Sequence, residues 1–112
     1  MSDKEILPIG TIVYLEGGTE KIMILNRAAL SQQDNSEVLF DYSGAIYPVG
    51  LNPEQVFYFN QENIERVIFM GFIDQEEERF VELYKKWLSD KGQSLKKGTV
   101  EPPKETPNFG FE

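Results

Sequence analysis

Histidine and cysteine are both missing from this chain of 112 residues. Their absence excludes the Ser–His–Asp and Cys–His nucleophile systems, zinc sites of the usual nitrogen and sulfur type and any disulfide framework. Catalysis by carboxylates or lysine stays open, but the commonest general base near neutral pH is gone. The composition therefore favours a protein without catalytic activity, cofactor or metal.

Long apolar runs are missing as well. None approaches the ~18 residues that a membrane-spanning helix requires. The first ten residues, MSDKEILPIG, lack the cationic start, apolar core and small-residue cleavage site of a secretory signal peptide. The length suits one domain and is too short for two. We therefore expect a single-domain cytoplasmic protein that does not insert into a membrane.

Basic residues are scarce, because Lys and Arg number 11 against 19 Asp and Glu, which leaves a net charge of −8. Most of the acidic excess lies in residues 1–74. Such a surface repels a nucleic-acid backbone and an anionic membrane, so we expect neither as a partner. The same charge also keeps a protein soluble.

Five stretches have the apolar content and the flanking turn residues of β-strands. Glu16-Gly17-Gly18-Thr19 predicts a hairpin turn between the first two, and it lacks the lysine and spacing of a phosphate-binding loop. The polar residues 31–37 predict a loop, and Ser43-Gly44 predicts a break or a close backbone approach. The expected strands are 7–15, 21–30, 38–48, 56–60 and 65–72.

Residues 75–90 carry the pattern of an amphipathic helix. Asp74 and Glu77 form an N-cap and capping-box pair, and Gly92 predicts the stop. Apolar residues then recur at helical spacing, which makes one stripe that either joins the core or docks a partner. The stripe consists of Phe80, Leu83, Tyr84, Trp87 and Leu88.

Strands followed by one helix predict an α+β fold. We expect an antiparallel curled sheet of about five strands, as a meander or partly open barrel, with one C-terminal amphipathic helix. Residues 1–92 form the single domain, and residues 93–112 predict a disordered or extended tail, because they are polar and contain three prolines. Phe109 and Phe111 near its end either dock or stay exposed.

The aromatic residues are the main candidates for binding. Bases stack on aromatics mainly in basic grooves, which this chain lacks, so packing and protein contact are the remaining roles. Asp34, Glu37 and Asp41 are interpreted as solvated loop charges, since they lack the ligand order of a calcium loop. The candidate protein-binding residues are Tyr42, Tyr47, Tyr58, Phe80, Tyr84 and Trp87.

Several motifs together carry a family resemblance. They are Leu7-Pro8-Ile9-Gly10-Thr11-Ile12-Val13, Asp41-Tyr42-Ser43-Gly44 with Tyr47-Pro48-Val49-Gly50, and Phe59-Asn60 leading to Ile64 and Val67. In order and spacing, the chain over about residues 6–85 resembles the domain-of-unknown-function family 4176, small proteins of Gram-positive bacteria. The resemblance implies a gene neighbourhood rather than a chemistry, since members tend to be encoded beside LXG-type polymorphic toxins of the type VII secretion system. It carries over no catalytic residues.

The resulting expectation is a non-enzymatic cytoplasmic accessory protein, a chaperone or targeting adaptor for an LXG-type toxin or another secretion-system component. A homodimer stays open. One alternative is an immunity protein that neutralises the toxin. Another is a small-ligand-binding domain or carboxylate-dependent enzyme, which requires a pocket lined by some of Asp41, Tyr42, Tyr47 and Glu62.

Overall fold

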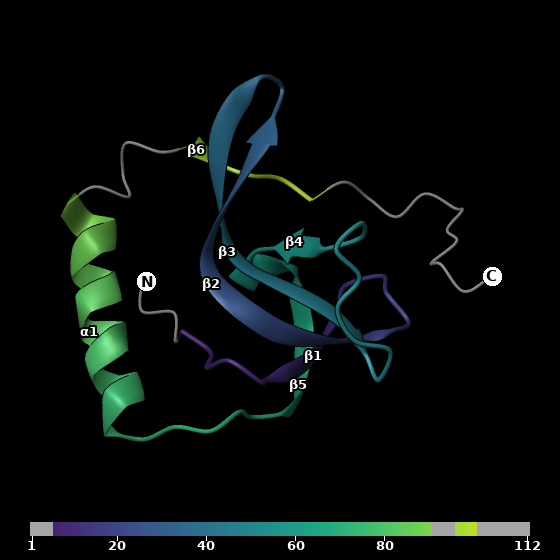
Figure 1. Cartoon of the computed structure of the whole chain (residues 1–112), viewed down its shortest axis with the longest axis horizontal. Coiled ribbons are helices and arrows are strands. Elements are labelled where there is room, and N and C mark those ends of the chain that lie inside the picture. Colours follow the sequence, from purple (N-terminus) through teal and green to yellow (C-terminus); the bar gives the residue numbers. More distant parts are fainter. Residues whose placement is uncertain (1–5, 91–95, 101–112) are drawn as a thin grey trace.

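The computed structural model describes residues 6–90 and 96–100. An antiparallel sheet in the order β4-β3-β2-β1-β5 curls without closing, and one helix lies outside it (Figure 1). This arrangement confirms the predicted α+β class. The elements are β1 (Ile12–Leu15), β2 (Lys21–Gln33), β3 (Ser36–Tyr47), β4 (Phe57–Phe59), the 3-10 turn η1 (Gln61–Asn63), β5 (Ile64–Phe69), α1 (Gln75–Asp90) and β6 (Lys96–Lys97).

The two hairpins of the sheet follow different sequence signals. The first confirms the glycine turn, because β1 and β2 pair directly across it. The prediction of a loop over residues 31–37 is wrong, since the pairing of β2 with β3 continues as far as Gln33, which lies opposite Ser36. Only Asp34 and Asn35 turn the chain, with φ angles of 54° and 66°. Two central residues at positive φ make the tight turn whose twist matches paired strands, and Asp and Asn tolerate it.

Gly44 marks a close approach between backbones rather than a break. β3 runs through it without interruption, so the predicted break is corrected and the predicted approach is confirmed. A Cβ at Gly44 would overlap the carbonyl oxygen of Met23 on β2. Glycine is needed there because the neighbouring strand leaves no volume for a side chain.

Replacing Gly44 by alanine is therefore expected to lower the free energy of unfolding by about 1–3 kcal/mol, because the strands must move apart. Denaturant unfolding measures the change. Ser36→Ala, on the exposed end of the same strand, is the control and should change stability by less than about 0.5 kcal/mol. Equal stability of Gly44→Ala and the parent chain would contradict the steric reading.

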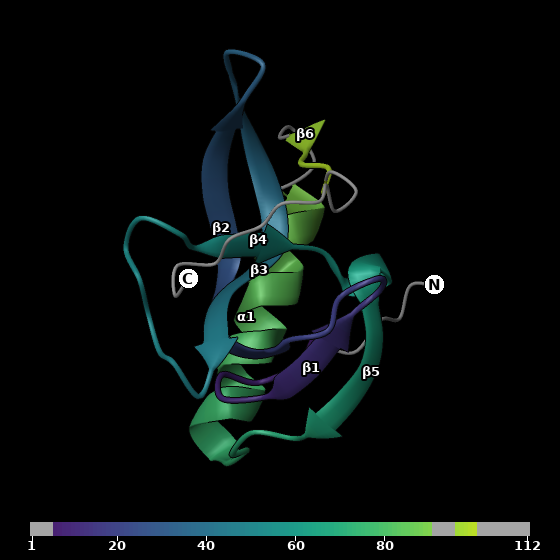
Figure 2. The ribbon, with the colours of Figure 1, turned by 90° about the vertical axis from the view of Figure 1, so that its right-hand side faces the viewer.

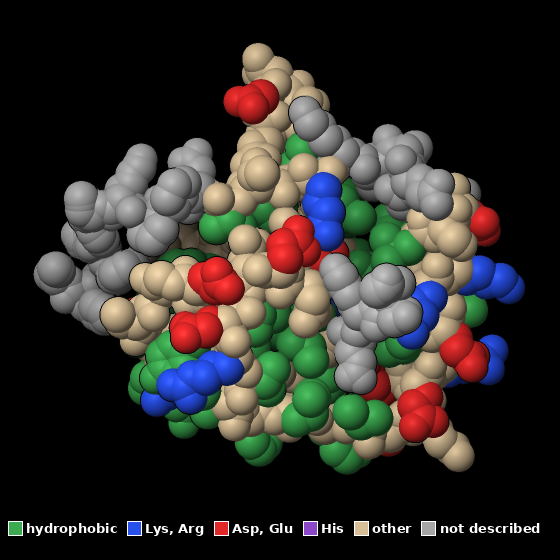
Figure 3. Space-filling model, turned by 180° about the vertical axis from the view of Figure 1, so that it is seen from behind, with side chains coloured by type: hydrophobic (Ala, Val, Ile, Leu, Met, Phe, Trp, Pro, Cys, Tyr) green, Lys and Arg blue, Asp and Glu red, His purple; other side chains and the backbone are tan. Residues whose placement is uncertain are grey.

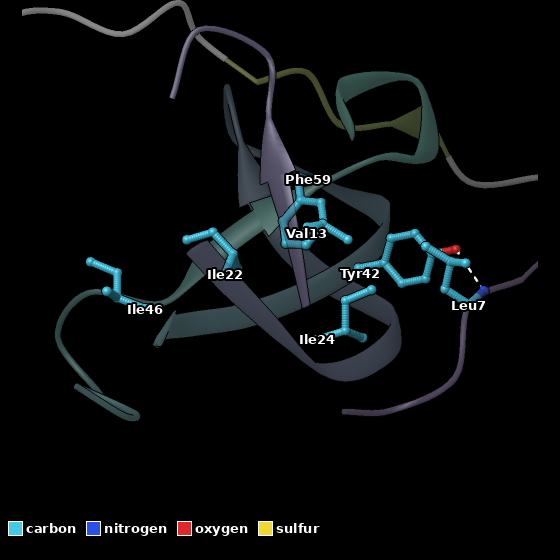
Figure 4. Close-up of a cluster of buried hydrophobic side chains, with 7 residues drawn as sticks. All are labelled: Leu7, Val13, Ile22, Ile24, Tyr42, Ile46 and Phe59. Carbon is cyan, nitrogen blue, oxygen red and sulfur yellow. Dashed lines mark hydrogen bonds between the residues drawn. The ribbon is translucent and has the colours of Figure 1, made fainter. Parts of the chain in front are cut away.

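The core lies inside the curl of the sheet (Figure 4). The Tyr42 hydroxyl ties the strands to the segment before β1, since it accepts a hydrogen bond from the Leu7 N–H at 3.0 Å. It also donates to the Gln61 side chain at 2.6 Å. The buried cluster consists of Leu7, Val13, Ile22, Ile24, Tyr42, Ile46 and Phe59.

The helix α1 confirms the predicted bounds of 75–90. Figure 2 shows it behind the sheet, along β2 and β3. The Asp74 side chain accepts a hydrogen bond from the Glu77 N–H at 3.0 Å, as an N-cap does. The Glu77 carboxylate, which a capping box would direct back to Asp74, instead binds Arg27 of β2. A link between helix and sheet thus takes the place of a local one.

The segment after α1 returns to the sheet. β6 pairs in parallel with β3, with Lys96 opposite Val38 and Lys97 opposite Leu39. Residues 96–100 of the predicted tail are therefore seen in contact with the domain. Gly92, Phe109 and Phe111 lie outside the described residues.

Candidate protein-binding surface

Exposed apolar side chains follow one another through the end of β5 and the connection to α1. Phe69 is 58% exposed and Phe72 is 78% exposed. Hydrophobic side chains gather along the lower part of the back face, where this segment lies (Figure 3). Contiguous exposed patches of this kind mark interaction sites more often than scattered residues do. We call this the apolar strip: Val67, Ile68, Phe69, Met70, Phe72 and Ile73.

The position of β5 in the sheet explains its exposure. It is an edge strand, and its register with β1 is interrupted twice, between the partners of Ile12 and Val13 and between those of Tyr14 and Leu15. Such irregularities disturb the alternation of inward and outward side chains. They also protect an edge from pairing with another strand, as do charges such as Glu65 and Arg66. The strip therefore offers side chains to a partner rather than a regular backbone edge.

The connection after β5 is held firmly to the body of the protein. The Gly71 N–H donates to the Thr11 hydroxyl at 3.0 Å, and Thr11 is fully buried. A Cβ at Gly71 would overlap the carbonyl oxygen of Ile9. Because Gly71 lies flat on the segment before β1, the neighbouring Met70 and Phe72 side chains are presented from an anchored backbone.

Next to the strip lies an open groove of about 500 Å³ between β2 and the start of α1. Phe72 belongs to both features, so the groove continues the strip. Acidic and apolar side chains both line the groove. The ion pair of Arg27 and Glu77 joins the two elements that form it. The groove is lined by Ile9, Asn26, Arg27, Phe72, Asp74, Glu76, Glu77 and Phe80.

Arg27 is the structural centre of the groove. Its guanidinium donates to both oxygens of Glu77, each at 2.8 Å, and to the Leu7 carbonyl at 3.0 Å. The Phe80 ring lies 4.4 Å from the guanidinium carbon, which is the geometry of a cation–π contact. Both members of the ion pair are largely shielded from water. The pair thus fixes α1 against β2 and shapes the groove.

Three of the six predicted binding residues come together on α1. Tyr84 stacks between Phe80, at 5.8 Å, and Trp87, at 6.2 Å between ring centroids. Tyr84 is buried and Trp87 half-buried, whereas Phe80 is 41% exposed. The apolar stripe of the helix is therefore divided, with Tyr84 facing the body and Phe80 and Leu83 open to a partner.

The other three predicted residues are not part of this aromatic stack on α1. Tyr42 is buried in the core and has no surface to offer. Tyr58 is half-buried and packs on Phe40 with ring centroids 5.5 Å apart. Tyr47 is 42% exposed, beneath Lys21 at the end of β3. Of the tyrosines in β3, Tyr47 is the exposed one.

Burial changes the acidity of two tyrosines. It raises the pKa of Tyr42 to about 12, mainly because the phenolate would lose its hydration. The same cause raises the pKa of Tyr84 to about 12. Both side chains therefore stay neutral well above the ordinary tyrosine range.

The four residues of the carboxylate alternative do not line the groove. Asp41 accepts from the Gln61 N–H at 2.8 Å and from Lys97 at 3.3 Å. Tyr42 points into the core, and Tyr47 lies at the far end of β3. Among residues 6–90 and 96–100, no group of three or more acids could hold a metal ion, and no helix is long and apolar enough to cross a membrane.

Sequence reasoning missed the apolar strip as a site. The predicted strand 65–72 includes most of the run VIFMGFI at residues 67–73, yet β5 stops at Phe69. The available signal was the lack of alternation, because a half-buried strand of an open sheet alternates apolar and polar residues. Ile9 and Phe72 also could not be assigned to one groove, since they are 63 positions apart in the sequence (72 − 9).

Among the comparisons with known proteins, one finds a match, and it is to a protein family. No curated protein and no solved structure matches the chain. A family model matches residues 6–80, a span that includes the apolar strip and all the residues that line the groove. The match covers well over half of the chain, and the protein therefore belongs to the family described as Domain of unknown function (DUF4176).

Proposed function

We propose that this protein is a non-enzymatic binding protein, a chaperone or targeting adaptor that pairs with an LXG-type toxin of the type VII secretion system before export. The apolar strip is the observation that supports binding. Six apolar side chains on an anchored backbone are exposed there, where water contact is unfavourable. The toxin as partner, and the cytoplasm as the place of binding, rest on the family resemblance.

Charge supports a partner of opposite sign. The chain carries a net charge of −8, and Asp74 and Glu76 lie in the groove beside Phe72. An apolar segment with basic flanks would satisfy both features, and the opposite charges would accelerate the encounter. The exposed Phe72 and Phe80 are the expected anchors, because large aromatic side chains carry much of the binding energy at interfaces.

Co-expression with the LXG toxin encoded beside its gene tests the proposal. The tagged chain should retain the toxin through purification in moderate salt. Phe69→Glu and Phe72→Glu should each weaken the complex at least tenfold, which corresponds to about 1.4 kcal/mol, as measured by calorimetry on the purified pair. Each places a charge on an apolar contact.

Leu51→Glu is the matched control, since Leu51 is 59% exposed but lies in the loop before β4, outside the strip. It should leave the affinity unchanged. If no complex forms, the toxin is not the partner. If Leu51→Glu weakens binding as much as Phe69→Glu does, the strip is not the interface.

A further inference from the structure

The first half of β3 has a free edge that the chain fills with its own C-terminal segment. β4 pairs only with Tyr42 to Gly44, so it leaves Val38 and Leu39 without a strand on that side. β6 occupies this place and pairs in parallel with those two residues. Adding an extended segment to a sheet edge is a general mode of peptide recognition. Residues 96–100 are therefore placed as a peptide ligand would be.

The contacts to this segment are directed mainly at its backbone. The Gly98 N–H donates to the Leu39 carbonyl at 2.9 Å, and the Asn60 side-chain amide donates to the Gly98 carbonyl at 2.9 Å. The side-chain amide of Gln33 makes two hydrogen bonds to the Thr99 backbone. Its nitrogen donates to the Thr99 carbonyl at 2.9 Å, and its oxygen accepts from the Thr99 N–H at 3.0 Å. A site that holds backbone atoms accepts any extended segment with suitable side chains.

Two features set the side chains that the site accepts. A Cβ at Gly98 would overlap the ring of Phe40, which is buried and packed on Tyr58. The position therefore requires glycine. One residue earlier, the Lys97 ammonium lies 3.3 Å from a carboxylate oxygen of Asp41 and 3.7 Å from one of Glu62. The position before the glycine therefore favours a cation.

We propose that this edge of β3 is a peptide-binding site for an extended segment of another protein with a Lys-Gly or Arg-Gly pair, and that residues 96–100 are a tethered occupant that such a segment displaces. Asn60 supports this assignment, because its side-chain oxygen accepts from the Asp41 N–H at 2.9 Å, which directs its amide to the carbonyl of the segment at this edge. The site is separate from the apolar strip and does not depend on the toxin being the partner.

The test uses the full-length chain and a blocked synthetic peptide, Lys-Lys-Gly-Thr-Val, which copies residues 96–100. Gly98→Ala should release the tethered segment, since the new Cβ overlaps Phe40. The variant should then bind the peptide with a dissociation constant of roughly 0.1 to 1 mM, as expected for a few contacts, seen as amide shifts of Leu39, Phe40 and Asn60 in NMR titration. The parent chain should respond more weakly at the same peptide concentration, because its own segment competes at an effective concentration of roughly millimolar or more.

Three controls complete the experiment. The peptide Lys-Lys-Ala-Thr-Val should not bind, and adding Gln33→Ala to Gly98→Ala should weaken binding of the original peptide at least threefold. If Gly98→Ala does not fold, Lys97→Glu releases the segment instead, by placing a third acid beside Asp41 and Glu62. Equal shifts in parent and variant, or none in a folded variant, would overturn the proposal.

The mass of the parent chain in solution supplies the last outcome. A monomer is expected, with residues 96–100 bound to their own sheet. A dimer in which each copy inserts this segment into the other would make a second copy the occupant, and would overturn the assignment to a different protein. Toxin capture by the apolar strip can succeed or fail independently of all these results.

Discussion

Replacing Arg27 by alanine is expected to lower the free energy of unfolding by about 3–5 kcal/mol, because it leaves a shielded carboxylate without its partner. Arg27 makes two hydrogen bonds to Glu77 and one to the Leu7 carbonyl, and stacks on Phe80. The variant therefore loses contacts to the helix and to the segment before β1 together. Denaturant unfolding measures the loss.

Two controls separate the ion pair from the loss of volume. Arg66→Ala removes an exposed arginine that stacks on Tyr14, and should change stability by less than about 1 kcal/mol. The double variant Arg27→Met, Glu77→Leu should lose less than Arg27→Ala alone, because it leaves no unpaired charge behind. If Arg27→Ala lowers the free energy of unfolding by less than about 1 kcal/mol, the ion pair contributes little to holding α1 against β2.

Alkaline pH should destabilise the protein strongly through its buried tyrosines. The pKa of Tyr42 and that of Tyr84 are each about 12 in the folded protein, against about 10 in an unfolded chain. The unfolded state releases these protons first, so stability is unaffected well below pH 10 and falls from about pH 10 to pH 12. Two pKa units correspond to roughly 2–3 kcal/mol for each tyrosine.

Unfolding free energies of the parent chain and of two phenylalanine variants, measured from pH 8 to pH 12, test this expectation. Tyr84→Phe should remove about half of the tyrosine-dependent loss. Tyr42→Phe should do the same, but should be less stable already at pH 8 because Leu7 and Gln61 lose their hydrogen bonds to the hydroxyl. If parent and Tyr84→Phe lose stability in parallel up to pH 12, the burial of Tyr84 does not control its titration.

The loss of Arg27 bears on binding as well as on stability. Arg27 and Glu77 line the groove, and Phe80 packs on Arg27. A helix released from β2 would no longer hold the acidic side chains beside Phe72. We therefore expect Arg27→Ala to weaken partner binding along with stability, whereas Phe72→Glu should affect binding alone, since Phe72 is largely exposed.

Local patterns were sufficient for the elements whose residues interact with near neighbours. The helix bounds 75–90 follow from the capping residue Asp74 and the 3.6-residue apolar period, and the first hairpin follows from its glycines. The loop assigned to residues 31–37 failed for the opposite reason. Polar residues there become strand because β2 and β3 pair residue by residue, and a single stretch of sequence does not reveal its partner strand.

What the sequence by itself determined is the α+β class, the order of the first five strands and the helix, and the acidic charge. Tertiary structure alone decided which aromatics are exposed, because Tyr42, Tyr47 and Tyr84 carry similar local signals and differ only in what packs over them. It also decided the groove, which joins Ile9 to Phe80, and the site in which Gln33 and Asn60 hold residues 98 and 99. The physical reason is distance along the chain: local conformation depends on neighbours within a few residues, whereas burial and binding geometry depend on contacts between segments that only folding brings together.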